Sequence, residues 1–226
     1  MERDARFLVR SVAEYYDARA SEYDVSAGFL DPISELSRDE MKREFQPLFN
    51  GLDVLEIGCG TGYWTKVISG SARSVHAVDI KASMISIARR KLSDIHNVTF
   101  QIADAYDLEE VPEGFNSAFA FWWWSHVPVS LLNDFISVLH GKLVNDALVL
   151  FVDQLPSAYE AKRRRRDSLG NHLEIRDISN GRDFLVVKNF PNEGEIIRVL
   201  EPLARDIEYR IHQEHHSWSV SYRVKK

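Results

Sequence analysis

The sequence predicts one α/β domain built on a doubly wound, mainly parallel β-sheet. Over the middle of the 226-residue chain, short and almost wholly apolar segments alternate with segments of helical periodicity. This alternation implies crossover connections and parallel strands, and strands that are apolar on both sides are typical of a sheet covered by helices on both faces. The last part of the chain ends instead in two neighbouring strand-like segments, which predict an antiparallel pair.

Composition and charge limit the kinds of protein this chain can be. Hydrophobic residues make up 45% and charged residues 27%, the usage of an ordinary globular domain with a core. The net charge of −6 argues against a general affinity for nucleic acid. The single cysteine, Cys59, excludes an internal disulfide, so we expect a reducing, cytoplasmic setting. No apolar stretch exceeds strand length, so we expect no membrane segment.

The first two regions of the domain are a cap and a ligand-binding half. Residues 1–49 predict a helical cap that breaks near Gly28 and Pro32. Residues 50–153 predict the ligand-binding half, with strands over Leu52–Ile57, Ser74–Asp79, Val98–Ile102, Ser117–Trp122 and Ala147–Val152. The helices between them are expected over Thr61–Ser69, Ala82–Leu92 and Val129–Leu139.

The last two regions are an insertion and a closing segment. Residues 154–190 predict an acceptor-side insertion that starts with a charged helix over Ser157–Leu169. A hairpin of Leu173–Ser179 and Arg182–Asn189 follows around the turn signal Asn180-Gly181. Residues 191–226 predict a helix over Glu193–Leu203 and the antiparallel strands Ile207–Gln213 and Trp218–Val224.

A glycine-rich loop carries the functional argument. The segment from Glu56 to Gly62 ends a buried strand and runs directly into a helix. Glycines at alternate positions allow a sharp turn and let a ligand lie against the backbone, where the helix N-terminus offers free N–H groups. The next strand ends in Asp79, the place where an acid accepts hydrogen bonds from ribose hydroxyls. The ligand is therefore expected to contain a ribose.

Two residues distinguish between ribose ligands. Tyr63 stands where the dinucleotide fingerprint needs a small residue, and Glu56 would repel a pyrophosphate. A carboxylate at Glu56 suits a cationic group, such as the amino group of a methionine moiety. S-adenosylmethionine is favoured, and a nicotinamide-dependent oxidoreductase remains the disfavoured alternative.

The segment Glu56-Ile57-Gly58-Cys59-Gly60-Thr61-Gly62 resembles the first motif of the class I S-adenosylmethionine-dependent methyltransferase superfamily. The resemblance extends over Tyr15 to Asp153 and implies a Rossmann-like fold with a seven-stranded sheet and an antiparallel C-terminal pair. It also implies the following cofactor-binding residues: Tyr16, Tyr23, Glu56, Gly58, Cys59, Gly60, Gly62, Asp79, Ile80, Met84, Asp104, Ala105, Phe121 and Trp122. A helix cap at Asp104 and simple core packing of the two tyrosines stay open as alternatives.

The end of the fourth expected strand should face the methyl acceptor. We expect Trp123, Trp124 and Asp153 to line the acceptor pocket, with some of the tryptophans packing the core instead. His126 is the candidate general base, and its alternative role is to anchor the loop by hydrogen bonding. We expect no metal, because tryptophans stand where metal-dependent relatives carry acids.

The function predicted from these residues is methyl transfer to a small-molecule acceptor. An RNA or protein methyltransferase is the alternative suggested by the run Arg163 to Arg166, for which a solvated helix face is the simpler interpretation. A non-catalytic protein that binds S-adenosylmethionine is the third interpretation. The acceptor's identity and the oligomeric state do not follow from the sequence.

Overall fold

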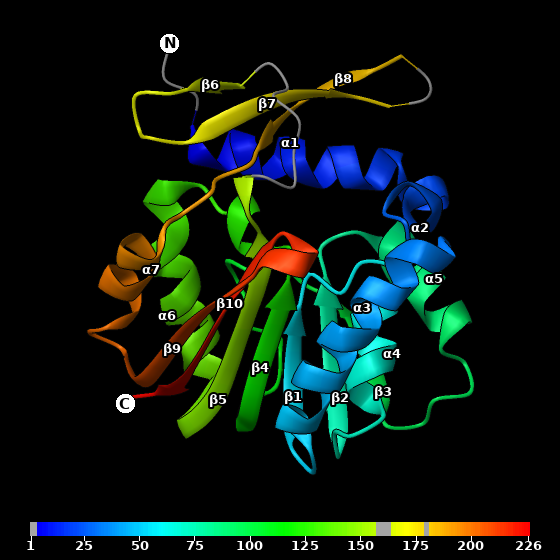
Figure 1. Ribbon diagram of the computed structural model, residues 1–226, viewed down its shortest axis with the longest axis vertical. Coiled ribbons are helices and arrows are strands. Elements are labelled where there is room, and N and C mark those ends of the chain that lie inside the picture. The colour runs from blue at the N-terminus through cyan, green and yellow to red at the C-terminus, as the bar shows by residue number, and fades with distance from the viewer. Residues whose placement is uncertain (1–3, 157–163, 179–180) are drawn as a thin grey trace.

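The protein is described by a computed structural model that covers residues 4–156, 164–178 and 181–226 (Figure 1). Its main sheet has seven strands in the order β3-β2-β1-β4-β5-β10-β9 within these residues. The strands are β1 (Asp53–Ile57), β2 (Ser74–Asp79), β3 (Val98–Ile102), β4 (Phe115–Phe121), β5 (Leu143–Gln154), β9 (Ala204–His212) and β10 (Ser217–Val224). Strands β1 to β5 are parallel, and β10 runs antiparallel between β5 and β9. The predicted fold class is confirmed.

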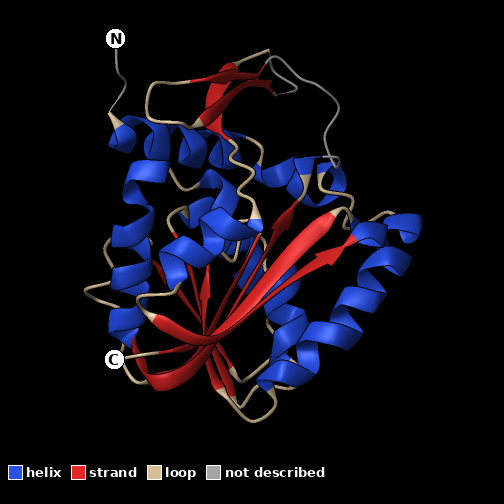
Figure 2. Cartoon of the chain, turned by 60° about the vertical axis from the view of Figure 1, so that its left-hand side comes forward, coloured by secondary structure: helices blue, strands red, loops and turns tan. Residues whose placement is uncertain are grey.

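Helices cover both faces of this sheet (Figure 2). They are α1 (Ala5–Ala18), α2 (Tyr23–Ser26), α3 (Pro32–Phe45), α4 (Tyr63–Ser69), α5 (Ala82–Lys91), α6 (Leu132–Lys142) and α7 (Glu193–Leu200). Alternate residues of one strand serve opposite faces, as the pleat requires. On β5, Phe151 belongs to the buried cluster that includes α6 and α7, whereas Leu150 belongs to the cluster that includes α3 and α4. No helix within the described residues is both long and apolar enough to cross a membrane.

Two helices begin later than the sequence predicts. The expected helix at Thr61 starts as α4 at Tyr63, because Gly62 takes a left-handed conformation with φ of 83° at the N-cap. The expected helix at Val129 starts with a 3₁₀ turn, Val129–Leu131, before α6 begins at Leu132. Both differences lie at helix N-termini, where local caps decide the boundary.

The insertion contains a second, small sheet. Its strands are β6 (Arg164–Arg166), β7 (His172–Asp177) and β8 (Asp183–Val187), which pair antiparallel in that order. The predicted hairpin of β7 and β8 is confirmed, although residue 180 of its turn lies outside the described residues. The predicted charged helix is wrong at Arg164–Arg166, where pairing with β7 overrides the helix propensity of arginine. Its segment 157–163 lies outside the described residues.

Helix α1 joins the small sheet to the main sheet. It runs between the small sheet and the ends of the main-sheet strands (Figure 1). Leu8, Val12 and Tyr15 of α1 share a buried cluster with Phe184 and Val186 of β8. The cap helix and the insertion, which are far apart in the sequence, therefore pack as one unit.

Replacing Leu8 by alanine should loosen this unit selectively. Leu8 is fully buried, so the Leu8→Ala change should cost about 2–5 kcal/mol of local stability. Hydrogen exchange should accelerate in α1, β7 and β8 and stay unchanged in β1 and β2. The matched control is Phe7→Ala, because Phe7 is 38% exposed. Equal acceleration across both sheets would show that the cap and insertion are not a separate unit.

Candidate functional site

The loops that follow β1, β2, β3 and β4 surround one cavity, and α1 and α2 cover it. Its lining combines backbone from the glycine loop with side chains from five other segments. The lining residues are Val9, Val12, Ala13, Tyr16, Tyr23, Gly58, Gly60, Val78, Asp79, Ile80, Lys81, Met84, Ala103, Asp104, Ala105, Tyr106, Phe121, Trp122, Trp123 and His126. Most of the residues predicted to bind the cofactor thus lie around a single space.

Two glycines of the loop are required for different reasons. Gly58 has a φ of 68°, and a Cβ atom there would lie 2.8 Å from Cε3 of Trp123. Gly62 packs against α5, where a Cβ atom would lie 3.0 Å from Cδ1 of Leu92. Gly58 therefore allows the loop to approach the Trp123 ring. Gly62 lies behind the loop and lets α4 approach α5, whereas the sequence predicted a cofactor contact for it.

Asp79 is held rigidly at the end of β2. Its Oδ2 accepts a hydrogen bond from the Gly60 N–H at 3.0 Å, and its Oδ1 accepts one from the Lys81 N–H at 2.9 Å. Burial raises the pKa of this carboxyl. Each carboxylate oxygen can accept a further hydrogen bond, so the group suits a pair of ribose hydroxyls. Ile80 and Met84 line the same side of the cavity.

Glu56 carries an unpartnered buried oxygen. It lines a smaller neighbouring cavity together with Cys59, and this cavity shares Gly58 and Gly60 with the first. The residue is 3% exposed, and its Oε2 has no hydrogen-bond partner among the described residues. Burial, together with the charge of Asp79, raises the pKa of Glu56 to about 8. A buried carboxylate without a partner fits the ammonium group of an amino-acid ligand.

Aromatic rings wall the smaller cavity. The Phe29 ring stacks on Tyr63 at 4.2 Å and on Trp122 at 5.7 Å between ring centroids. Trp122 has a φ of 56°, an uncommon backbone conformation for a bulky residue. Its N–H donates to the Val152 carbonyl at 2.7 Å, which holds the strained turn. Strain of this kind costs on the order of 1–3 kcal/mol and concentrates at functional sites. Phe121 and Trp64, which also line this cavity, stack on each other.

The opposite end of the main cavity lies after β3. Asp104 Oδ1 accepts the N–H of Tyr106 at 3.0 Å, which makes a local turn. Arg6 of α1 lies 3.9 Å from Asp104 Oδ2 and stacks over the Tyr106 ring at 5.3 Å. Ala105, which lies between Asp104 and Tyr106 in the sequence, is buried. Helix α1 of the cap therefore contacts Asp104, the acid that the sequence predicts to bind the adenine.

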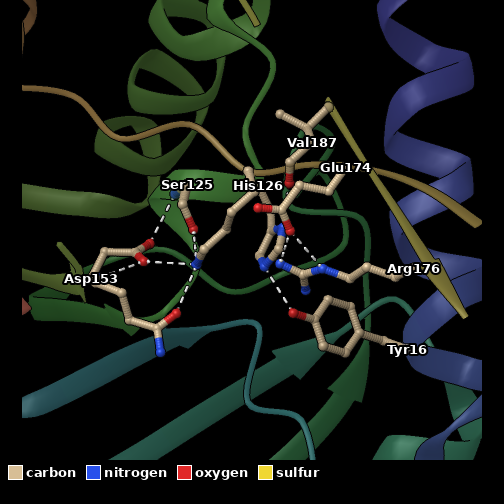
Figure 3. A network of polar contacts seen from close by, with 9 residues as sticks. Tyr16, Ser125, His126, Asp153, Glu174, Arg176 and Val187 are labelled. Carbon is tan, nitrogen blue, oxygen red and sulfur yellow. Dashed lines mark hydrogen bonds and ion pairs between the residues drawn. The ribbon is translucent and has the colours of Figure 1, made fainter. Parts of the chain in front are cut away.

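His126 is held from both sides of its ring (Figure 3). Its Nδ1 lies 2.7 Å from the Val187 carbonyl, which can only accept, so Nδ1 carries the proton. Its Nε2 therefore accepts a hydrogen bond from the Tyr16 hydroxyl at 2.8 Å. Burial, with the nearby charges of Lys188 and Arg176, holds the pKa of His126 well below 6.5. The imidazole is neutral, with its lone pair on the cavity side.

Of the three residues predicted to line the acceptor pocket, one lines the cavity and two lie elsewhere. Trp123 lines the cavity, between Gly58 and Tyr106. Trp124 is 3% exposed and packs in the core against Phe151, so the predicted pocket position is replaced by a core position. Asp153 is fully buried behind the His126 turn, where it accepts the Ser125 N–H. Neither is among the residues that line the cavity.

Several lining residues were missed by the sequence interpretation. These include Val9, Val12 and Ala13, which recur with the predicted Tyr16 at i, i+3, i+4 and i+7; this spacing marks one helix face and could have indicated them. Arg19 follows the same helix, and its guanidinium lies over the rings of Tyr15, Tyr16 and Tyr23. No local pattern indicates Arg19, because its surroundings arise from the bend between α1 and α2.

Known proteins resemble this chain in sequence and in fold. A methyltransferase-domain family model matches residues 54–146. A malonyl-[acyl-carrier protein] O-methyltransferase of Bacillus cereus is 38% identical over 158 residues, which cover 68% of this chain and 55% of that protein. A corresponding protein of Pectobacterium atrosepticum is 33% identical over 100 residues, or 42% of this chain and 36% of its own length. The chain thus matches between about a third and about half of these relatives' length.

A solved structure, a DhpI–SAH complex, matches with a TM-score of 0.74 and 28% identity over 96% of this chain and 97% of that chain. A DhpI–SAM–HEP complex matches equally well. With the glycine loop, Asp79 and the sheet order, these findings define a Rossmann-like methyltransferase domain whose cofactor is S-adenosylmethionine. The chain belongs to the class I S-adenosylmethionine-dependent methyltransferase superfamily.

Replacing Glu56 by glutamine should stabilise the cofactor-free protein and weaken cofactor binding. The Glu56 pKa is about 8 in the folded chain and 4.5 in the reference state, so the folded state retains a proton that the unfolded state releases. The resulting penalty on the free energy of unfolding grows from about pH 5 to pH 8. Glu56→Gln should therefore raise Tm by about 5 °C at pH 8 and by little at pH 5.

The same variant should bind S-adenosylmethionine at least about tenfold more weakly in calorimetry at pH 8, because the ammonium loses its anionic partner. Glu109→Gln is the control, since Glu109 is exposed and outside the cavity. Unchanged affinity in Glu56→Gln would remove Glu56 from the cofactor site.

Proposed function

We propose that the chain transfers a methyl group from S-adenosylmethionine to a small acceptor that carries an acidic group. The bound cofactor supplies a methyl group already activated by its sulfonium. The observation that carries the proposal is a positive charge, that of Arg19, beside the acceptor end of the cavity. The chain's own residues bind, orient and shield the reactants, which is the main requirement of an in-line displacement.

Arg19 is a cation with neutral partners. Its Nη1 donates to the Tyr15 hydroxyl at 2.6 Å, its Nη2 donates to Ser26 Oγ, and no ion pair to it occurs among the described residues. The rings beneath it include Tyr16 and Tyr23, which line the cavity. A guanidinium without an ion pair, packed on two rings that line the cavity, attracts carboxylate or phosphate groups, which it can bind through two hydrogen bonds.

Two further cations lie buried near His126. Arg176 pairs with Glu174 at 2.8 Å and Lys188 with Asp153 at 3.3 Å, so each is compensated. Burial is the main cause that lowers the pKa of His126, and the charges of Lys188, Arg176 and Arg19 act in the same direction. The Bacillus cereus relative is named for a malonyl acceptor, and a malonyl group carries a carboxylate. This name supports an acidic acceptor here.

We assign the cofactor's groups by the chemistry of the lining. Glu56 holds the ammonium end and Asp79 the ribose. Asp104, Ala105, Ile80 and Met84 receive the adenine. Tyr16 and Tyr23 close the cavity from the cap side. The unpartnered oxygen of Glu56 and the two anchored oxygens of Asp79 support this arrangement.

His126 is proposed as the base for an acceptor that must lose a proton. Its Nε2 accepts a hydrogen bond from the Tyr16 hydroxyl, and both residues line the cavity, so the neutral imidazole would take the proton of an acceptor hydroxyl or amine through the Tyr16 hydroxyl. An acceptor oxygen that is already ionised needs no base. Arg165 and Arg166 of β6 line different grooves, so these two side chains do not form one shared basic site.

A methyl-transfer screen should favour acids over their neutral analogues. Each small carboxylate, phosphate or phosphonate is paired with its amide or ester, and turnover is followed by release of S-adenosylhomocysteine. Arg19→Gln should raise KM for the acidic acceptor about 10- to 100-fold while leaving cofactor affinity unchanged, because one charge-assisted contact is lost. Arg10→Gln is the control, since Arg10 is exposed on the same helix. Equal use of neutral analogues would refute the acidic acceptor.

The pH profile and a substitution test His126. Because the pKa of His126 is well below 6.5, the base stays neutral, and kcat/KM should remain flat from pH 8 to about pH 6 instead of halving near 6.5. His126→Gln should lower kcat by about 100-fold or more if a hydroxyl or amine is methylated. A rate within a few-fold of wild type would show that His126 is not the base. The ionised oxygen of the acceptor would then be the nucleophile without help from a base.

A further inference from the structure

A buried ion pair lies directly behind His126. Lys188 follows the last residue of β8 and is 1% exposed. Its Nζ lies 3.3 Å from Asp153 Oδ1, donates to Gln154 Oε1 at 2.9 Å and donates to Ser125 Oγ at 2.8 Å. These three acceptors match the three hydrogens of an ammonium group. The pair therefore joins the end of β5 in the main sheet to the end of β8 in the small sheet.

Ser125 is bound to both sides of this pair. Its N–H donates to Asp153 Oδ2 at 2.8 Å, and its hydroxyl accepts from Lys188. Its carbonyl accepts the Asn189 N–H at 2.7 Å. The turn from Trp124 to His126 is thereby fixed to β5 and to the segment after β8 through every polar group of one residue.

The position of His126 is fixed by Ser125 and Val187, which the ion pair holds in place. It follows Ser125 in the chain, and its Nδ1 donates to the carbonyl of Val187, the residue before Lys188 (Figure 3). The backbone that carries the imidazole and the carbonyl that fixes its proton are thus held by the same ion pair. Movement of either Asp153 or Lys188 would change the distance between the His126 ring and Val187.

Burying such a pair needs a reason other than stability. The desolvation of two buried charges roughly cancels their attraction, and apolar residues of similar size often stabilise a core as well or better. An ion pair differs from an apolar contact because its directional hydrogen bonds define one arrangement of the groups around it.

We infer that Asp153 and Lys188 are positioning residues that set the orientation and the tautomer of His126. This inference replaces the pocket role expected for Asp153, and it rests on the proposed function through the role of His126. Neither side chain is among the residues that line the cavity; they act through Ser125 and the Val187 carbonyl, so that Nε2 rather than Nδ1 presents its lone pair to the Tyr16 hydroxyl.

Three variants separate charge from shape. Asp153→Asn keeps the shape of the carboxylate, and Lys188→Met keeps the length of the side chain. The double variant leaves no unpaired buried charge, so it should fold even if Lys188→Met alone does not. Asp146→Asn is the matched control, because Asp146 lies on the same strand and forms an exposed pair with Arg205.

The tautomer of His126 is read by nitrogen NMR on the full chain labelled with ¹⁵N-histidine. His126→Gln identifies its signals among the eight histidines. Wild type and the control should show only the Nδ1–H tautomer at His126, whereas the double variant should show both tautomers. A folded double variant that keeps the pure Nδ1–H tautomer would overturn the inference.

Kinetics give the second readout. In the double variant kcat should fall at least about tenfold, while the affinity for S-adenosylmethionine stays within twofold of wild type, because the cofactor residues are not disturbed. Failure of the proposed base role is distinguishable: His126→Gln would then be fully active, while the NMR result would still decide whether the ion pair sets the tautomer.

Discussion

The hydrogen bond from the Gly60 N–H to Asp79 is the contact on which the site depends. It forms only because β1 and β2 pair in parallel, with Ile57 opposite Val78, so that the glycine loop and the acid emerge at the same edge. Loop and acid then hold each other without a ligand. The remaining features of the site, including the Glu56 carboxyl and the Trp122 turn, are arranged around this fixed point.

Charge divides the cavity into two ends. Glu56 and Asp79 place buried carboxyls at the end assigned to the cofactor, whose amino-acid and sulfonium groups are cationic. Arg19 adds positive charge near His126, at the end where we propose that an acidic acceptor binds. A low-dielectric enclosure strengthens both fields. Under this proposal, the opposite charges at the two ends would orient a cationic donor and an anionic acceptor relative to each other.

The cap couples these two ends mechanically. Helix α1 packs on the small sheet through Leu8 and Tyr15, and its Tyr16 lines the cavity. Tyr16 also bonds His126, which the small sheet holds through Val187.

Much of the fold and of the cofactor side was predictable, because it is encoded locally. Periods of two and 3.6 residues mark strands and helices, and the spacing from the glycine loop to Asp79 follows from one strand–helix–strand unit. The acceptor side was not predictable in the same way. Pairing with β7 turned an arginine-rich segment into β6, and packing moved Trp124 into the core. The neighbours of Arg19, Asp153 and Lys188 come from distant segments. The sequence by itself determined the sheet, the glycine loop and the acid at the end of β2, whereas only the tertiary structure decided which charges meet at His126, because contacts between distant segments leave no local pattern in the sequence.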